Sequence, residues 1–179
     1  MSDKKENRRR RDTNRRNQPS VKWTEKVIEV KRVTKVTTGG KKLSFRAVVV
    51  VGNNLGKVGV GVAKADDVTK AVQKAVNIGR KNLIVIPLTN NKTIPHLVTG
   101  HFGASNIIIR PAAPGSGVIA GSSIRIVLEA AGIQNILAKR LGGNNLLNYA
   151  QATIEALKNL KTLKQIAKQR DLSLTHFYN

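Results

Sequence analysis

Residues 43–63 have the sequence LSFRAVVVVGNNLGKVGVGVA, and this stretch predicts how the first half of the chain folds. Apolar residues alternate with Ser44 and Arg46 and then become a run of valines, which predicts a strand over about 43–51. The glycines and asparagines of 52–56 are typical of a hairpin turn. Valine and glycine alternate over 57–63, so we expect a second strand antiparallel to the first.

A further strand and a helix complete this unit. Val and Ile recur among Lys, Arg and Thr over 26–37, which predicts a half-buried strand and hence an antiparallel three-stranded meander. A helix is expected over about 67–82, with Asp66 or Asp67 as its cap. Its apolar residues fall within an arc of roughly 140°, which suits packing on a sheet. The opposite side carries Lys70, Lys74, Asn77 and Lys81.

The second half predicts shorter elements beyond a boundary between Pro87 and Pro95. A short apolar strand at 83–88 ends the first unit. Strands are then expected at 96–100, 106–110 and 134–138, helices at 121–131 and from Asn144 or Asn145 to about 160, and a last short helix lined by Lys161, Lys164 and Lys168. The Pro/Gly/Ser-rich loop at 111–121 leads into a helix N-terminus, where N–H groups attract anions. A backbone phosphate of RNA and a neighbouring protein are both candidates for this loop.

The charge of the chain indicates a polyanionic partner. Among 179 residues, 32 Lys and Arg face 10 Asp and Glu, which gives a net charge of +22. Residues 1–19 carry +5, residues 20–83 carry +10 and residues 84–179 carry +7, so the folded part is basic as well. Nucleic acid is favoured over an anionic membrane surface. The N-terminal stretch predicts a disordered arm that orders on RNA, or else a solubilising extension.

The residue types argue against an enzyme. The chain has no Cys and three His, so neither a zinc site nor a Cys nucleophile is expected, and we expect no metal and no cofactor. Its few acids are scattered and suggest no acid/base pair. The glycines at 56, 59 and 61 start a strand, whereas a nucleotide loop opens a helix. Apolar runs are far shorter than the ~20 residues of a membrane span, so no membrane partner is expected.

The motifs, in this order, resemble the family of small-subunit ribosomal protein five of bacteria and plastids. The matching motifs are Glu25–Ile28, Lys31–Lys35 with Gly39 and Gly40, Val50–Gly52, Gly56–Gly61, Lys64–Ala65, Ile119–Gly121, Val127–Gly132 and Asn135–Lys139. The resemblance covers about 22–165 and is specific because many motifs keep one order and family-like spacings.

The resemblance implies an α+β fold of two small α/β domains. The first, at 22–88, would be like a double-stranded-RNA-binding domain, with the meander and one helix. The second, at 89–165, would have the C-terminal fold named after this protein, between a disordered basic arm at 1–21 and a tail at 166–179. That second fold is shared with the galactokinase–homoserine kinase–mevalonate kinase superfamily, which explains a loose similarity of the 114–123 loop to the phosphate loop of those kinases.

The family further implies a structural, non-enzymatic constituent of the small ribosomal subunit. Its partners would be small-subunit rRNA, ribosomal proteins four and eight, and mRNA near the path by which it enters, with an influence on decoding accuracy. The loop that approaches the spectinomycin site would be Arg32, Val33, Thr34, Lys35, Gly39 and Gly40. The side that faces protein four would include Arg110, Gly115, Gly117 and Arg125. Val60 and Val62 replace aromatic residues that relatives often carry, so base stacking is not expected there.

Charge and position together predict the residues that contact rRNA. They are Lys31, Arg32, Lys35, Lys41, Lys42, Arg46, Lys57, Lys64, Lys70 and Lys74. Two other classes stay open: a free double-stranded-RNA-binding regulator, which needs only the first half, and a small-molecule kinase.

The composition also bears on location. Lys, Asn and Ile number 19, 16 and 15, and all have A/T-rich codons, which suits a plastid or a low-GC bacterium. The first residues include Asp3, Glu6 and Asp12 and no apolar segment, so neither a transit peptide nor a signal peptide is expected. We therefore expect the plastid stroma if the organelle encodes the chain, and otherwise the bacterial cytoplasm.

Overall fold

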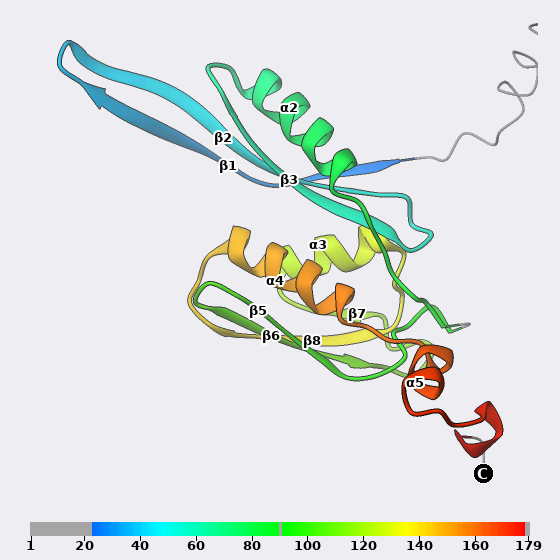
Figure 1. Cartoon of the computed structure of the whole chain (residues 1–179). Coiled ribbons are helices and arrows are strands. Elements are labelled where there is room, and N and C mark those ends of the chain that lie inside the picture. Colours follow the sequence, from blue (N-terminus) through cyan, green and yellow to red (C-terminus); the bar gives the residue numbers. More distant parts are fainter. Residues whose placement is uncertain (1–22, 90, 178–179) are drawn as a thin grey trace, which may run out of the picture.

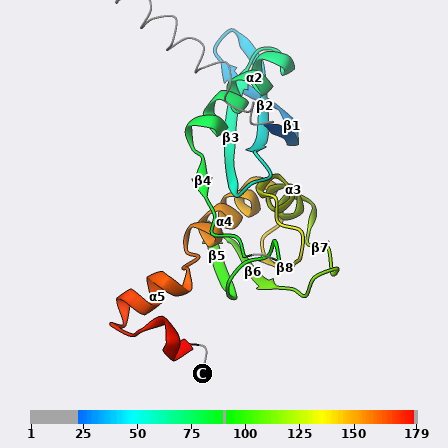
Figure 2. The same ribbon diagram turned by 90° about the vertical axis from the view of Figure 1, so that its right-hand side faces the viewer.

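The protein is arranged in four layers in the computed structural model, which describes residues 23–89 and 91–177 (Figures 1 and 2). Helix α2 (Val68–Lys81) covers one face of a first sheet, and helices α3 (Ser122–Ala131) and α4 (Leu146–Lys158) lie between that sheet and a second one. The predicted arm at 1–21 lies outside the described residues.

The first sheet confirms the predicted meander and extends it by one strand. It contains β1 (Thr24–Thr37), β2 (Gly40–Gly52), β3 (Lys57–Ala65) and β4 (Ile84–Val85), all antiparallel and in that order. The apolar run at 83–88 yields only the two residues of β4, which pair with the first two residues of β3. The remainder of that run leads into the second half, where Ile86 is buried in the shared core.

The valine run of β2 is buried on both faces, which explains why it does not alternate with polar residues. Val49 and Val51 belong to the cluster under α2, whereas Val48 and Val50 belong to the larger core formed with α3 and α4. All four valines are almost fully buried. The middle of the sheet therefore joins the two halves of the chain into one structure.

Two glycines of β3 let α2 approach the sheet closely. A Cβ at Gly61 would lie 2.0 Å from the carbonyl oxygen of Ala75, and one at Gly59 would lie 2.4 Å from that of Gly79. Asp67 occupies the N-cap position of α2, but its carboxylate accepts a hydrogen bond from the hydroxyl of Thr69 and makes no side-chain cap bond to the helix backbone. Asp67 therefore stands at the expected N-cap position, but its side chain does not cap the helix.

The second sheet has the order β5-β6-β8-β7 and packs on α3 and α4 with one face only. Its strands are β5 (Val98–Phe102), β6 (Ser105–Pro111), β7 (Val118–Ile119) and β8 (Ile136–Gly142). The sequence analysis missed β7, which lies inside the predicted loop and pairs in parallel with β8. Because β7 has only two residues, it leaves no periodic pattern in the sequence.

The helix ends of the second half follow local sequence signals. Gly132 ends α3 with a φ of 87°, a left-handed conformation that glycine adopts readily. Asn145, not Asn144, caps α4, since its side chain accepts a hydrogen bond from the N–H of Leu147 at 3.1 Å. Beyond α4 lie α5 (Leu163–Gln169) and the 3₁₀ helix η1 (Leu174–Phe177), so α5 spans the boundary predicted at residue 165.

The two halves are also joined by backbone hydrogen bonds. The turn between β2 and β3 sits against the end of α3, where the N–H of Asn54 donates to the Ala130 carbonyl at 3.1 Å and that of Gly56 donates to Ala131 at 2.9 Å. These bonds satisfy carbonyls that the end of a helix leaves without partners. A Cβ at Gly132 would lie 2.1 Å from the carbonyl oxygen of Asn54, so only glycine permits this approach.

Candidate nucleic-acid interface

Five lysines meet at the place where β3 ends and the β1–β2 hairpin continues alone. They surround a hollow of about 540 Å³, which we call the lysine hollow. Its walls also contain Ser44, Ala65 and Asp66. The five lysines, which come from both strands of the hairpin, from β3 and from α2, are Lys35, Lys42, Lys64, Lys70 and Lys74. The structure thus brings together five of the ten residues predicted to contact RNA.

The positive charge of the lysine hollow is not neutralised within the described part of the chain. None of its five lysines forms an ion pair there, although five other Lys and Arg side chains of the described residues do. Asp66 is the one acid in its wall, and it accepts a hydrogen bond from the Ser44 hydroxyl at 3.4 Å. A hollow of this kind attracts an anion with several charges.

Basic side chains also lie directly opposite one another across the strands of the hairpin. Lys31 of β1 pairs with Arg46 of β2, and Arg46 pairs with Lys64 of β3. Lys35 and Lys42 form a second such pair, four register positions nearer the tip. Like charges in directly opposed positions destabilise a sheet, so these rows, which we call the cation rows, cost the free protein stability.

Only one residue of the cation rows has an ion-pair partner in the described residues. Lys31 binds Glu29 on its own strand at 2.9 Å. Arg46 is half-buried, and its Nε is buried without a hydrogen-bond partner. A partly desolvated guanidinium without a carboxylate is costly unless an external anion pairs with it.

Three predicted contact residues lie apart from this group. Lys57 is the first residue of β3, seven positions from Lys64 and therefore ~23 Å from it at ~3.3 Å per residue. Arg32 and Lys41 pair with Phe45 and Val36, which places both on the opposite face of the sheet from the cation rows. The prediction grouped these residues by charge and did not separate the two faces, to which successive residues of a strand point alternately.

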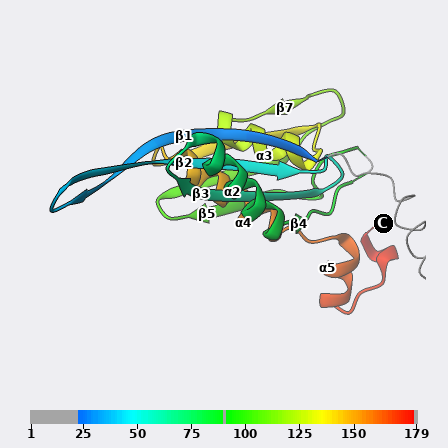
Figure 3. The same cartoon turned by 90° about the horizontal axis from the view of Figure 1, so that it is seen from above.

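The tip of the β1–β2 hairpin projects beyond the rest of the molecule (Figures 1 and 3). The pairing of Thr37 with Gly40 closes a turn of two residues, and the Thr37 hydroxyl donates to the Gly40 carbonyl at 3.1 Å. Val36 is 73% exposed. A Cβ at Gly39 or Gly40 would meet nothing within 4 Å, so the space around the turn is open to a partner.

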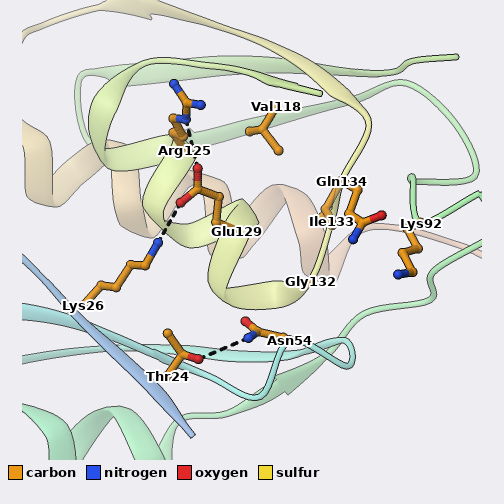
Figure 4. A pocket seen from close by; sticks show the side chains of 10 residues that line it. All are labelled: Thr24, Lys26, Asn54, Lys92, Val118, Arg125, Glu129, Gly132, Ile133 and Gln134. Atoms are coloured by element: carbon orange, nitrogen blue, oxygen red, sulfur yellow. Dashed lines mark hydrogen bonds and ion pairs between the residues drawn. The ribbon is translucent and has the colours of Figure 1, made fainter. Parts of the chain in front are cut away.

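A second hollow, of about 620 Å³, lies between β1 and α3 (Figure 4). At its centre the Glu129 carboxylate accepts from the Lys26 ammonium at 2.7 Å and from Nε of Arg125 at 2.9 Å. These two cations, Lys26 first, hold the pKa of Glu129 below its ordinary value. The carboxylate therefore joins the two halves of the chain, a role that the sequence analysis missed because Lys26 lies 103 residues away.

The Pro/Gly/Ser-rich loop is held by one buried asparagine. The Asn135 side-chain oxygen accepts from the N–H groups of Gly115 at 3.0 Å and Gly117 at 3.4 Å, and its amide donates to the Asn91 carbonyl. Because Ser116 N–H also has a partner, in the Ala113 carbonyl, these N–H groups are not available to a phosphate. This part of the loop is therefore a structural turn.

The four residues predicted to face another protein do not form one site. Arg110 lies on β6 and pairs with the exposed Leu137, so it belongs to the outer face of the second sheet. Arg125 lines the hollow of Figure 4, on the other side of that sheet. Gly115 and Gly117 lie in the loop between these two surfaces along the chain.

Among residues 23–89 and 91–177, no cluster of three or more His, Cys, Asp or Glu is placed to hold a metal ion. No helix among them is both long enough and apolar enough to cross a membrane.

Comparison with known proteins identifies the family. Residues 23–87 match the model of ribosomal protein S5, N-terminal domain, and residues 100–170 match that of ribosomal protein S5, C-terminal domain. The chain belongs to the ribosomal protein S5 family. Members of the S5 family are structural, non-enzymatic constituents of the small ribosomal subunit, which argues against the small-molecule kinase kept as an alternative above.

Similar proteins come from cyanobacteria and plastids. The chain is 55% identical to small ribosomal subunit protein uS5 of Gloeothece citriformis, over 96% of this chain and 99% of that protein. It is 58% identical to uS5c of Guillardia theta, over 90% and 96%, and 60% identical to uS5c of Emiliania huxleyi, over 90% and 98%. The S5 relatives are thus matched over nearly their whole length.

The structure also accounts for two valines of this S5 chain. Val60 is almost fully buried in the core shared with α3 and α4, and Val62 packs against the same core. Side chains at these positions face the second domain. These two positions therefore lie at the joint between the domains and not on an RNA-stacking surface.

Proposed function

We propose that this S5 chain binds small-subunit rRNA through the lysine hollow, the cation rows and the hairpin tip. The observation that carries the proposal is the set of five lysines gathered from four elements with no ion pair in the described residues. Lysines that neutralise phosphates release counterions, which drives association and makes it salt-dependent. The remaining predicted contacts, Arg32, Lys41 and Lys57, would touch rRNA from other sides.

The hairpin tip is the segment that the family resemblance places near the spectinomycin site. Arg32, Val33, Thr34 and Lys35 lie on β1, Gly39 lies in the turn, and Gly40 is the first residue of β2. Its projection from the body and its open surroundings support a position against rRNA.

The second domain is proposed to face other small-subunit proteins. Arg110 on the outer face of the second sheet, together with Arg125 and the turn at Gly115 and Gly117, would contact protein four, and protein eight would also be a neighbour. Contact with mRNA near its path of entry into the subunit, and an influence on decoding accuracy, follow from the same placement. The division into 22–88 and 89–165 belongs to this proposal, with the arm at 1–21 as an additional RNA contact.

The relatives support a location either in a plastid or in the cytoplasm of a bacterium. Both uS5c of plastids and uS5 of cyanobacteria match the chain over 90% or more of its length. The abundance of residues with A/T-rich codons supports the plastid stroma, with the gene in the organelle, and the bacterial cytoplasm is the alternative.

A charge-reversal experiment tests the RNA-binding part of the proposal. Lys70→Glu plus Lys74→Glu changes two lysines of the hollow that are exposed on α2. The double variant should fall off small subunits at a lower salt concentration than the wild type in a stepwise salt wash, because it loses two phosphate contacts and adds two repulsions. Incorporation equal to the wild type at raised salt would contradict the assignment of α2 to the interface.

A further inference from the structure

His96 joins two segments that lie 65 residues apart in the sequence. It follows Pro95 in the segment that leads into β5. Its Nε2 accepts a hydrogen bond from the backbone N–H of Lys161 at 3.1 Å, and its Nδ1 lies 2.8 Å from the Leu97 carbonyl oxygen. The imidazole thus connects the segment before β5 with the linker between α4 and α5.

The two partners of His96 determine which form of the ring is present. A backbone N–H can only donate a hydrogen bond, and a carbonyl oxygen can only accept one. The ring must therefore carry its proton on Nδ1 and offer a lone pair at Nε2, which is one of the two neutral tautomers. A charged imidazole has a proton on both nitrogens and could keep only the bond to Leu97.

Within the described part of the chain, no carboxylate lies within ion-pair distance of His96. The Lys158 ammonium at the end of α4 pairs with Glu155 at 2.8 Å, and the Lys161 ammonium donates to the Gln169 side chain at 3.2 Å. The charged side chains on the segments that meet here are Lys92, Glu155, Lys158 and Lys161. Since three of these four are cations, a proton on His96 would add to a positive surrounding.

Lys161 is the residue at which the chain leaves the second domain. Leu157 and Leu160 are buried in the shared core, whereas most residues from Lys161 onward are exposed. Helix α5 and η1 then extend away from the second sheet (Figures 2 and 3). The bond to His96 therefore holds the chain at the point where α5 departs from the domain.

The start of α5 is closed by its own side chains. The Thr162 hydroxyl accepts a hydrogen bond from the Gln165 N–H at 3.3 Å, and the Gln165 side chain accepts one from the Thr162 N–H at 2.9 Å, which forms a capping box. The N–H of Lys161, one residue earlier, binds His96 instead. The orientation of α5 relative to the second domain therefore depends on the bond that directly precedes its cap.

The segment from Lys161 to Phe177 is basic. It contains four Lys and Arg residues and one acid, Asp171, which gives a net charge of +3 with histidine neutral. Its cations Lys164, Lys168 and Arg170 are exposed, and none of the three forms an ion pair in the described residues. The direction of α5 therefore decides where these cations are presented to an anionic neighbour.

We infer that His96 is a positioning residue for this basic segment and that it acts only in its neutral form. The neutral ring holds Lys161 and so presents the cations of α5 in one direction. Histidine changes its charge between pH 5 and pH 8. On acidification Nε2 gains a proton that faces the N–H of Lys161, and the linker is released. The chain thus contains a pH-sensitive latch between its second domain and its basic C-terminal segment.

Hydrogen exchange of the Lys161 amide, followed by solvent-exchange NMR in the isotope-labelled full chain, tests this inference. The observable is the protection factor, the intrinsic exchange rate at each pH divided by the measured rate. The wild type should be about two- to tenfold less protected at pH 5 than at pH 8, the value of one hydrogen bond. The nitrogen signals of the His96 ring should show its proton on Nδ1 at pH 8.

Three variants separate the charge of His96 from its contact. His96→Gln keeps an acceptor of similar reach that cannot be protonated, so Lys161 should be equally protected at both pH values. His96→Ala removes the acceptor and should lower the protection by about two- to tenfold at pH 8, with no further loss at pH 5. His101→Ala removes an exposed histidine of β5 and should behave as the wild type.

Equal protection of Lys161 in the wild type at both pH values would overturn the inference, and so would a His96 ring with its proton on Nε2 at pH 8. A loss of protection at pH 5 that persists in His96→Gln would assign the effect to another group and would overturn it as well. The first two outcomes are measured on the wild type, so the inference can be rejected even if a substitution prevents folding.

Discussion

The two halves of β2 have the same backbone structure and opposite surroundings. Residues 47–52 are buried between α2 on one face and α3 and α4 on the other, whereas residues 40–46 are exposed or half-buried and carry Lys41, Lys42 and Arg46. One half excludes water from both faces. The other half presents charge that the described residues do not neutralise.

This difference separates stability from binding along a single strand. The buried half supplies apolar area removed from water, the main favourable contribution to folding. The exposed half places like charges opposite one another, which opposes folding and becomes favourable only when an anion binds. Substitutions in the buried half should therefore change mainly the free energy of unfolding, and substitutions in the exposed half should change mainly the binding of an anion.

The largest expected effect is on the free energy of unfolding. Val50→Ala should lower it by about 2 kcal/mol, between the usual costs of Ile→Val and Leu→Ala in a core, because Val50 is fully buried. Leu43→Ala on the exposed half should change it by about 0.5 kcal/mol or less. Urea unfolding of both variants measures the difference. Equal losses would show that the two halves of β2 do not differ as described.

The joint between the domains should depend on pH through Glu129. Glu129→Gln removes the carboxylate shared by Lys26 and Arg125 and should cost about 1 kcal/mol at pH 7, the upper end for exposed pairs. Since folding lowers the Glu129 pKa, this contribution is complete above the ordinary value of 4.5 and disappears as the pH falls through the folded value.

Unfolding of wild type and variant from pH 7 to pH 3 measures this effect. The difference between the two should shrink below about pH 4.5. Glu155→Gln is the matched control, because Glu155 pairs with Lys158 within the same helix and should contribute only a few tenths of a kcal/mol. A difference for Glu129→Gln that is constant with pH would contradict the role of the ionised carboxylate.

The smallest expected effect has the opposite sign. Lys64→Gln removes one of two like charges in directly opposed positions and should raise the stability of the free protein by about 0.5 kcal/mol. The corresponding rise in the unfolding midpoint is about 1–2 °C for a chain of this size, and it should decrease as salt screens the repulsion.

Lys139→Gln is the control for this gain. Lys139 pairs with Ile108 and has no cation opposite it, so its substitution should give no rise. A free protein that loses stability with Lys64→Gln would mean that the cation rows are not repulsive.

Local patterns predicted most of the fold. Alternation and turn residues indicated β1, β2 and β3, and the arcs of α2 indicated its buried face, because these elements are long and periodic. β4 and β7 have two residues each and were missed or misjudged for that reason. The helix end at Gly132 follows from glycine alone, whereas the choice of Asn145 as the cap of α4 needed the structure.

The candidate site was predicted as a set of residue types and not as a surface. The sequence indicated which lysines are near one another along the chain, but the register of β1 against β2 decides which share a face. The prediction from sequence therefore grouped Arg32 and Lys41 with basic residues that lie on the other face of the sheet. Contacts between distant segments, such as Lys26 with Glu129, leave no local pattern from which to predict them.

Sedimentation of the full chain from a native lysate tests the central claim most directly, that the uncompensated charge of the first sheet holds an S5 protein to small-subunit rRNA. The account predicts that the wild type travels in the small-subunit peak and that reversing charge in the lysine hollow moves it to the free fraction as salt is raised. Absence of the wild type from that peak would contradict the account.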